Sequence, residues 1–295
     1  MQFLFKIIYH PFINPILLRI NRLLSLFTSF RLPPSGVIRL RLTGSNSFWM
    51  ATNQTSYVTK LLYWQGPLSF EYTSIFKELI PQCKVFFDVG ANSGYYSLVA
   101  ASLNDKIKVH AFEPAQGPLH YLTKNVTLND LSEQVLIHSE ALSSESGQVP
   151  FYEVKNRKYS YLKYNLGGIG SLQKDFSKKA YNVRTQTLDC FVSENLISNI
   201  DLIKLDTEGT ENLILDGAKE TIQKYLPIII CETLFNRIED KLEIIMKDHN
   251  YLFFNYEKGK LKQVDTLIRS ADNGVRDCFF VHPSRVSLIK EFIAY

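Results

Sequence analysis

Four carboxylates in the sequence each follow a short apolar run, at the point where a strand would end. They are Asp88, Glu113, Asp206 and Glu232. Continuous apolar runs of this kind are typical of strands that are buried on both faces of a parallel sheet. Ligands of open α/β sheets bind outside the carboxyl ends of the strands. Four carboxylates at that edge repel one another unless a ligand or a cation lies among them. We therefore predict a binding site there.

The turn after the first of these strands contains two glycines, Gly90 and Gly94. Glycine lets the backbone approach a ligand closely. A dinucleotide-binding fingerprint would also need glycine at positions 92 and 95, where Asn92 and Tyr95 stand, and a P-loop would need Gly-Lys followed by Ser or Thr. The turn therefore lacks both of these phosphate-binding motifs.

Glu113 ends the next strand along the chain, 25 residues after Asp88. A carboxylate in this place can accept hydrogen bonds from the two hydroxyls of a ribose. A ribose acceptor without a pyrophosphate site favours a nucleoside that carries no phosphate, and S-adenosylmethionine (SAM) is such a nucleoside. We predict that Asp88, Gly90, Asn92, Gly94 and Glu113 form a SAM site.

Alternating strands and helices would position these residues. The chain has 45% apolar and 21% charged residues, which is the composition of a globular protein with a large core and excludes a disordered chain. Strands are expected at 85–87, 109–112, 135–137, 200–205, 228–231 and 277–281, a hairpin at 251–256 and 261–264, and helices at 95–102, 119–128, 211–224 and 237–248. This order predicts an α/β fold with a mostly parallel, seven-stranded sheet, helices on both faces and an antiparallel C-terminal hairpin.

The sequence resembles the FkbM-type methyltransferases over about residues 68–285. The matching runs are Phe87-Asp88-Val89-Gly90-Ala91-Asn92-Ser93-Gly94-Tyr95-Tyr96-Ser97, Ala111-Phe112-Glu113-Pro114, Glu140-Ala141-Leu142-Ser143, Asp201-Leu202-Ile203-Lys204-Leu205-Asp206-Thr207-Glu208-Gly209 and Leu215-Asp216-Gly217-Ala218. The resemblance implies a Rossmann-like class I fold and a SAM-dependent O-methyltransferase. Its acceptor would be a hydroxyl of a sugar, a glycan, or another small or lipid-linked molecule. The resemblance also adds residues to the SAM site, namely Ala91, Tyr95, Tyr96, Pro114, Glu140 and Ala141.

Methylation of a hydroxyl needs a base within about 3 Å of the attacking oxygen. None of the six histidines falls in the motifs above. Asp206 is the first candidate, Glu232 the second and Glu208 the third, acting as the base or as a ligand of a cation such as Mg²⁺, which prefers carboxylate oxygens. The alternative is that Asp206 binds only the methionine amino group of SAM. Lys204 lies on the same face of its strand as Asp206. It is expected to form an ion pair with Glu232, or to position Asp206 or the substrate.

The segment Tyr159–Leu172 interrupts the alternation of strands and helices. We predict that it shapes the acceptor site, because tyrosines combine an apolar ring with a polar tip and glycines let a loop close. An exposed hairpin without a ligand is the alternative. The residues assigned to the acceptor are Tyr159, Tyr161, Tyr164, Gly170 and Ser171.

Residues 1–65 are expected to form a basic, apolar, helical extension, and residues 66–295 the SAM-dependent methyltransferase domain. The first 70 residues contain seven basic residues and no acidic one. The pattern predicts a helix from Ile16 to Phe27 with an apolar stripe, listed as Ile16, Ile20, Leu23, Leu24 and Phe27. This helix would pack on the main domain, lie on an anionic membrane surface, or belong to an organellar presequence. Polar residues and prolines interrupt residues 1–30 too often for a membrane span.

Sequence motifs distinguish this protein from other methyltransferases of the same fold. An adenine methyltransferase of nucleic acids would carry Asp or Asn followed by Pro-Pro after the fourth strand, and a cytosine methyltransferase would carry Pro-Cys; the sequence has neither. A nucleic-acid partner is therefore disfavoured. A metal-assisted O-methyltransferase, a protein methyltransferase and a non-catalytic SAM-binding protein stay open. No two of the four cysteines form a Cys-x-x-Cys pair, which favours a reducing, cytoplasmic compartment and no zinc site.

Overall fold

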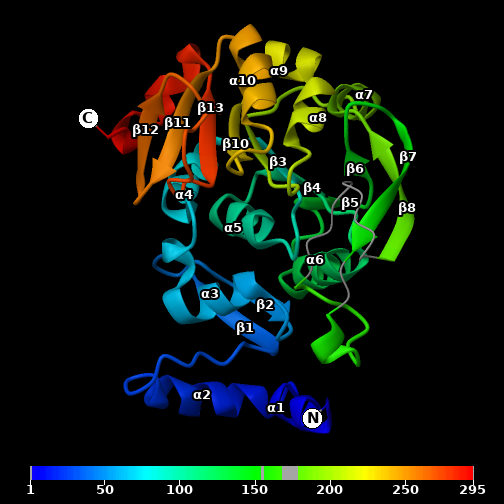
Figure 1. The fold of residues 1–295 in the computed structure, drawn as a ribbon, viewed down its shortest axis with the longest axis vertical. Coiled ribbons are helices and arrows are strands. Elements are labelled where there is room, and N and C mark those ends of the chain that lie inside the picture. Colours follow the sequence, from blue (N-terminus) through cyan, green and yellow to red (C-terminus); the bar gives the residue numbers. More distant parts are fainter. Residues whose placement is uncertain (1, 154–155, 168–178, 295) are drawn as a thin grey trace.

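The computed structural model describes residues 2–153, 156–167 and 179–294, and an eight-stranded mixed sheet forms its centre (Figure 1). In sheet order the strands are β12 (Lys260–Val264), β11 (Leu252–Glu257), β13 (Asp277–Val281), β10 (Ile228–Glu232), β9 (Leu202–Leu205), β3 (Val85–Val89), β4 (Lys108–Phe112) and β5 (Val135–His138). The five strands from β10 to β5 are parallel, and β13 runs antiparallel between β10 and β11. The expected count of seven strands was wrong, because both arms of the C-terminal hairpin join the sheet.

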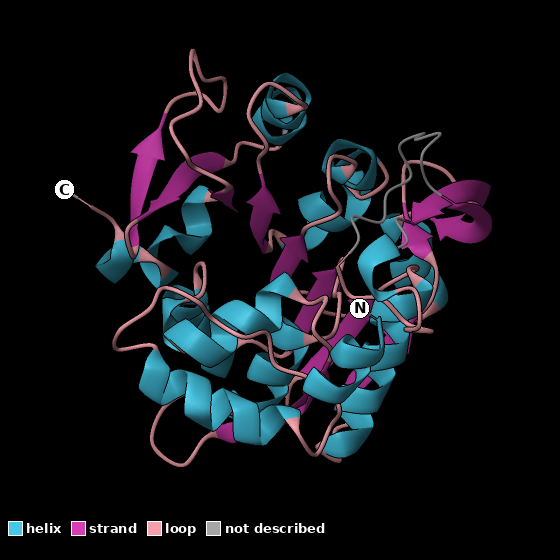
Figure 2. Cartoon of the chain, turned by 60° about the horizontal axis from the view of Figure 1, so that its bottom comes forward, coloured by secondary structure: helices cyan, strands magenta, loops and turns pink. Residues whose placement is uncertain are grey.

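Helices cover both faces of this sheet (Figure 2). The neighbours Phe86 and Phe87 in β3 point to opposite faces, and each is fully buried in a separate apolar core. The helices that contribute to the first core are α3 (Tyr57–Gln65), α4 (Thr73–Leu79), α5 (Tyr95–Leu103) and α6 (Gln116–Leu128). Those of the second are α7 (Leu188–Glu194), α8 (Glu211–Asp216), α9 (Lys219–Tyr225) and α10 (Glu239–Asp248). The single helix expected at 211–224 is two helices, since α8 ends at Gly217, where the backbone passes close to the carbonyl of Ser143.

A second, three-stranded sheet follows β5 and was not anticipated. Its order is β6 (Ala141–Leu142), β8 (Lys179–Gln186) and β7 (Gly147–Glu153). β6 pairs with β8 in parallel, and β7 pairs with β8 in antiparallel orientation. This sheet places Ala141, Leu142 and Phe151 beside the carboxyl edge of the large sheet, where they line a cavity.

The N-terminal extension is only partly helical. It contains α1 (Gln2–Ile8), α2 (Asn14–Leu24) and α3 (Tyr57–Gln65), and also a hairpin of β1 (Gly36–Arg41) and β2 (Ser47–Thr52). The backbone N–H of Ala51 donates to Asn125 Oδ1 at 2.6 Å, and that of Trp49 donates to Asn129 Oδ1 at 2.7 Å. These bonds attach β2 to α6. Short 3₁₀ turns complete the fold, at Pro67–Ser69, Ile80–Gln82, Arg157–Tyr159, Pro283–Leu288 and Lys290–Phe292.

The apolar stripe of α2 faces solvent, and the opposite face of the helix faces the protein. Its buried residues are Asn14, Leu18 and Asn21, whereas Ile16 and Ile20 of the predicted stripe are exposed. The expectation that the stripe packs on the main domain was therefore wrong. No helix within the described residues is long and apolar enough to cross a bilayer.

Candidate functional site

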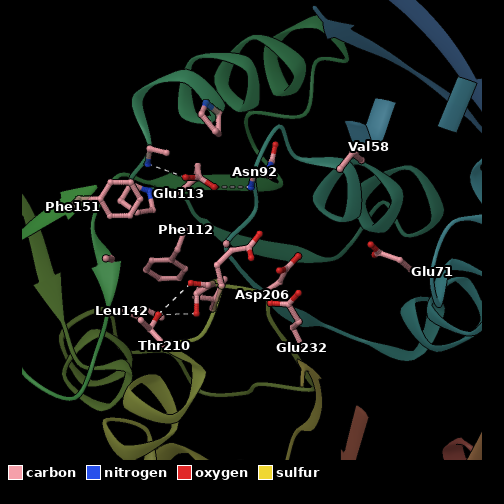
Figure 3. Close-up of a pocket in the computed structure, with 18 residues that line it drawn as sticks. Val58, Glu71, Asn92, Phe112, Glu113, Leu142, Phe151, Asp206, Thr210 and Glu232 are labelled. Carbon is pink, nitrogen blue, oxygen red and sulfur yellow. Dashed lines mark hydrogen bonds between the residues drawn. The ribbon is translucent and has the colours of Figure 1, made fainter. Parts of the chain in front are cut away.

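A cavity of about 240 Å³ lies at the carboxyl edge of β3, β4, β9 and β10 (Figure 3). Phe112, Leu142 and Phe151 form an apolar wall on one side. Carboxylates form the other side, and they belong to Glu71, Asp206, Glu208 and Glu232. Glu113 and Asn92 lie between the two sides. The cavity therefore joins an apolar surface suited to a flat ring with a strongly acidic surface.

The turn after β3 has the conformation that its glycines permit. Gly90 has φ = 75° and Gly94 has φ = 89°, both in the left-handed region. A side chain at Gly90 would collide with the carbonyl oxygen of Asp206, so the turn can lie this close to β9 only with glycine there. The backbone N–H groups of Gly90 and Ala91 both donate to the carbonyl of Phe112 at 3.0 Å. The turn is thus fixed between β9 and β4.

Glu113 is held by two backbone donors. Its Oε2 accepts the N–H of Asn92 and its Oε1 accepts the N–H of Ala115, each at 2.8 Å. Burial raises the pKa of Glu113 to about 7, although these two bonds oppose the shift. A carboxylate oxygen has more than one lone pair, so both oxygens can accept a further hydrogen bond from a ribose. The glycine turn, the fixed carboxylate and the apolar wall together fit the adenosine part of SAM.

Lys204 is buried in β9 and holds together the ends of two strands. Its Nζ lies 3.4 Å from Asp88 Oδ1 and 3.3 Å from Asp206 Oδ2, and it donates to the carbonyl of Gly90 at 3.1 Å. Burial alone would lower the pKa of Lys204, but Asp206, Asp88 and Glu71 outweigh it and raise that pKa above its usual range. The expected partner Glu232 was wrong: register places Lys204 opposite Asp88 on β3.

The loop after β9 is fastened by Glu211. One oxygen of this buried carboxylate accepts the N–H of Thr207 at 2.7 Å, and the other accepts the N–H of Gly209 at 3.1 Å. Glu208 between them has φ = 62° and lines the cavity. The carboxylate in the first turn of α8 therefore keeps the loop folded against the edge of the sheet.

The acidic side of the cavity contains carboxylic acids whose pKa values lie well above the ordinary range. Burial and the nearby charge of Asp206 raise the pKa of Glu71 to about 7, against a hydrogen bond from Tyr96 that lowers it. Burial, Asp206 and Glu208 raise the pKa of Glu232 to about 9. The pKa of Asp277, which faces Glu232 in the antiparallel register of β13 and β10, is also raised by burial.

These shifts predict that the ligand-free protein loses stability as pH rises. In the folded state Glu71 and Glu232 bind protons above the pKa of about 4.3 that an unfolded glutamate has. The free energy of unfolding should therefore fall between about pH 4.5 and pH 9, by at most about 1.4 kcal/mol per pH unit for each group. Glu232→Gln should flatten this dependence between about pH 7 and pH 9, as measured by urea unfolding at several pH values. An unchanged slope in the variant would show that Glu232 ionises at its ordinary pKa.

A second cavity of about 480 Å³ adjoins the first. The two share Glu71, Asp206 and Glu232. The rest of its wall comes from the β11–β12 hairpin and from the residues that precede β13, listed as Tyr256, Glu257, Lys258, Asn273, Gly274, Val275, Arg276 and Asp277. The three shared carboxylates therefore stand between two cavities.

The predicted SAM residues divide into a lining set and a supporting set. The lining set is Gly90, Asn92, Glu113, Pro114 and Ala141. The residues that do not line this cavity are Asp88, Ala91, Gly94, Tyr95, Tyr96 and Glu140. Asp88 is fully buried beneath the turn, where its Oδ2 accepts from Ser97 Oγ at 2.6 Å. Tyr95 and Tyr96 belong to the first apolar core. Glu140 lies 3.9 Å from His138 Nδ1.

The three tyrosines assigned to the acceptor lie elsewhere. The ring of Tyr159 packs edge-on against Phe5 at 5.2 Å, Tyr161 Oη accepts from Gln54 Nε2 at 2.7 Å, and Tyr164 stacks on His120 at 3.9 Å. None of the three lines the two cavities. Their contacts join this segment to the N-terminal extension and to α6. Gly170 and Ser171 fall outside the described residues.

Several lining residues carry no signal of their own in the sequence. Glu71 precedes α4, and Val58 belongs to α3 of the N-terminal extension. The position of Asp277 could have been inferred from the sequence, because it begins a strand. An antiparallel strand next to β10 starts where β10 ends, which places Asp277 beside Glu232. Within the described ranges, no group of three or more His, Cys, Asp or Glu side chains is arranged to hold a metal ion.

Comparison with known proteins gives a family match. The model of the FkbM methyltransferase domain matches residues 88–253, which is more than half of the chain. The match begins at the last residues of β3 and ends in β11, so it includes the turn, Glu113 and the loop after β9.

Three curated proteins illustrate the similarity. Methyltransferase sdnD from Sordaria araneosa is 26% identical over 195 residues, which cover 58% of this chain and 75% of that protein. The 2-O-methyltransferase NoeI from Sinorhizobium fredii is 26% identical over 148 residues, covering 48% of this chain and 59% of that protein. The 31-O-demethyl-FK506 methyltransferase FkbM from Streptomyces tacrolimicus is 27% identical over 157 residues, covering 46% and 60%. The chain thus spans about three fifths of the length of the last two.

Among solved structures, the chain is similar to the methyltransferase FkbM from Methylobacillus flagellatus KT. The TM-score is 0.42 at 16% identity, and the alignment covers 67% of this chain and 43% of that one. The order of the parallel strands and the antiparallel insertion of β13 confirm the expected Rossmann-like class I architecture. The chain belongs to the FkbM methyltransferase domain family and is a SAM-dependent methyltransferase.

Proposed function

We propose that the protein transfers the methyl group of SAM to a hydroxyl of a small-molecule acceptor, with a sugar or glycan as the preferred class. One observation carries this proposal. Asp206 belongs to the wall between two adjoining cavities, one with the ribose-type acceptor Glu113 and one open to a second molecule. A donor and an acceptor bound in these cavities would meet at this carboxylate.

The first cavity would take the donor. Glu113 would accept from the ribose hydroxyls, while Phe112 and Leu142 offer apolar surface to the adenine ring. When bound, SAM supplies a methyl group on a positively charged sulfur. The acidic side of this cavity as a whole suits a bound cation of this kind.

The second cavity would take the acceptor. Carboxylates accept hydrogen bonds from hydroxyls, and a protonated Glu232, with its pKa raised to about 9, can donate one as well. Arg276 and Lys258 provide further donors at the opposite wall. This mixture of donors and acceptors matches the hydroxyl groups of a sugar ring. The similarity to NoeI, a 2-O-methyltransferase, supports transfer to oxygen.

A methyl-transfer assay tests the proposal. Purified protein would be incubated with SAM and with extracts of glycans, lipid-linked glycans and free sugars, and S-adenosylhomocysteine and acceptor masses would be measured. We expect release of S-adenosylhomocysteine together with an acceptor that is heavier by one CH₂ group. Methylation of a protein or a nucleic acid, with no change in any hydroxyl compound, would contradict it. Removal of divalent cations by EDTA in the same assay tests the predicted assistance by Mg²⁺.

Glu113→Gln should weaken SAM binding by about 1–3 kcal/mol, because the amide loses the charge and turns its NH₂ group toward a backbone donor. Calorimetric titration with SAM measures this loss. Glu145→Gln is the matched control: Glu145 is exposed and lines neither cavity, and its variant should bind SAM like the wild type. Equal affinity of the Glu113 variant and the wild type would remove Glu113 from the SAM site.

We place this activity in the cytoplasm. All four cysteines are free, and Cys231 and Cys278 are buried in the sheet, as expected for thiols that are kept reduced. The division into an extension at 1–65 and a methyltransferase domain at 66–295 also stays a proposal. Val58 from the extension lines the donor cavity, which predicts that the domain alone would bind SAM less well.

A further inference from the structure

Helices α1 and α2 lie end to end at one end of the molecule, beyond the β1–β2 hairpin (Figure 1). Their outward surface is apolar. Phe3, Phe12 and Phe27 are 76%, 81% and 85% exposed, and Ile16, Ile20 and Leu23 are also exposed. So many large apolar side chains exposed on two adjacent helices are unusual on a protein that stays free in water, and they mark a surface that binds a partner or a membrane.

The inward face of α2 is fixed by polar contacts. Asn14 Oδ1 accepts the N–H of Ser35, and Asn21 Oδ1 accepts the N–H of Leu32, each at 2.7 Å. Leu18, between these two asparagines, is 2% exposed. A helix that covers a protein core turns its apolar face inward. Here the asparagines are inside and the apolar stripe is outside, and both asparagines are bonded, so the outward position of the stripe is built into the fold.

The orientation of helix α1 is also fixed, by contacts of one of its sides with the segment around Tyr159. The ring of Phe5 packs against Tyr159, and Tyr9 packs against the same ring at 5.7 Å. Gln2 Nε2 donates to Ser160 Oγ at 2.7 Å. These contacts occupy the inner side of α1 and leave Phe3 in solvent.

The positive charge of this end of the molecule favours an anionic lipid surface as the partner. Residues 1–70 contain seven basic residues and no acidic one, and Arg19 and Arg22 of α2 are both exposed. Basic residues beside an exposed apolar face are the pattern of helices that lie on anionic lipid. A second copy of this chain docked face to face would bring the same positive charges together, which is unfavourable.

We propose that α1 and α2 bind the surface of a bilayer that contains anionic lipid. The helices lie in the plane of the interface, with Phe3, Phe12, Ile16, Ile20, Leu23 and Phe27 at the boundary between headgroups and acyl chains. Arg19, which is exposed beside the stripe, contacts lipid phosphates. This binding does not depend on methyl transfer, so it can be tested even if the proposed acceptor is wrong.

Co-sedimentation of the full chain with vesicles tests the proposal. The probe is phosphatidylcholine vesicles with and without phosphatidylglycerol. We expect the wild type to bind the anionic vesicles, and the triple variant Ile16→Ser, Ile20→Ser, Leu23→Ser to bind at least about tenfold more weakly, since each serine removes buried apolar surface. Arg19→Gln should weaken binding to the anionic vesicles severalfold, and added salt should act in the same direction.

The matched control is the triple variant Leu196→Ser, Ile244→Ser, Ile268→Ser, which changes three exposed apolar residues outside α1 and α2. It should bind the anionic vesicles like the wild type. All changed side chains are exposed, so thermal unfolding should stay the same in every variant. Equal vesicle binding by the wild type and the triple variant of α2 would overturn the proposal. So would a wild-type dimer in lipid-free light scattering that becomes a monomer in that variant, because a second copy would then cover the face.

Discussion

Lys204→Met is expected to lower the free energy of unfolding by about 3–5 kcal/mol. The Nζ of Lys204 is the counter-charge of Asp88, a carboxylate with no measurable exposure whose Oδ1 makes no hydrogen bond. Removal of one partner of a buried ion pair leaves the other charge uncompensated, and this costs far more than the pair itself contributes. Methionine fills a similar volume, so the loss would report charge and not a cavity. Urea unfolding of the two proteins at the same pH measures it.

Lys219→Met is the control for the loss of a lysine charge. Lys219 pairs with Asp216 on the surface, where both side chains are about half exposed, and exposed pairs of this kind contribute little to stability. The double variant Lys204→Met, Asp88→Asn should recover part of the stability lost in the single variant, because the uncompensated charge is gone. A single variant as stable as wild type, or a double variant with no recovery, would show that the pair does not hold the strand ends together.

The edge of the sheet was predictable because its signals are local. Each apolar run that leads to Glu113, Asp206 or Glu232 forms a strand within a few residues of its expected bounds. Parallel strands bring their carboxyl ends to one edge, so the three carboxylates meet in one cavity. The family followed from the same short runs, since the match begins at the turn itself.

The partner of Lys204 was not predictable in the same way. A central strand has two neighbours, and the sequence does not state which of them carries the opposite charge in register. Strand β9 lies between β10 and β3, and the register places Asp88 of β3 directly across from Lys204. Glu232 of β10 stands two residues beyond the position opposite Lys204.

Two carboxylates of the acidic wall, Glu71 and Asp277, and the inward face of α2 were missed for a related reason. Glu71 and Asp277 are far apart in the chain and come together only through the packing of α4 and β13 around the sheet edge. The stripe of α2 indicated two unlike faces, but not which one turns inward. That was decided by Asn14 and Asn21, whose amide oxygens accept from the segment that returns to the hairpin.

We propose Asp206 as the base for the acceptor hydroxyl, because it lines both cavities. Its side chain is 40% exposed, belongs to both cavities and lies 3.3 Å from the ammonium of Lys204. Glu232 is a weaker candidate at neutral pH, because a carboxylic acid with a pKa raised to about 9 is mostly protonated there. As the acceptor oxygen attacks, the Asp206 carboxylate would take its proton, and the ion pair with Lys204 would hold that carboxylate in place.

Asp206→Asn is therefore expected to lower kcat by about a hundredfold or more, which is the usual effect of losing a general base. Asparagine keeps the shape of the side chain and can still accept a hydrogen bond from Lys204, so SAM affinity should be largely retained in calorimetric titration. If Asp206 only holds the amino group of SAM, the outcome is reversed: SAM affinity falls and kcat at saturating SAM is normal. Asp216→Asn, on the surface of α8, controls for the substitution and should leave both quantities unchanged. Glu232→Gln separates the second candidate from the first, since a base at Glu232 would give the large loss of kcat in that variant and not in Asp206→Asn.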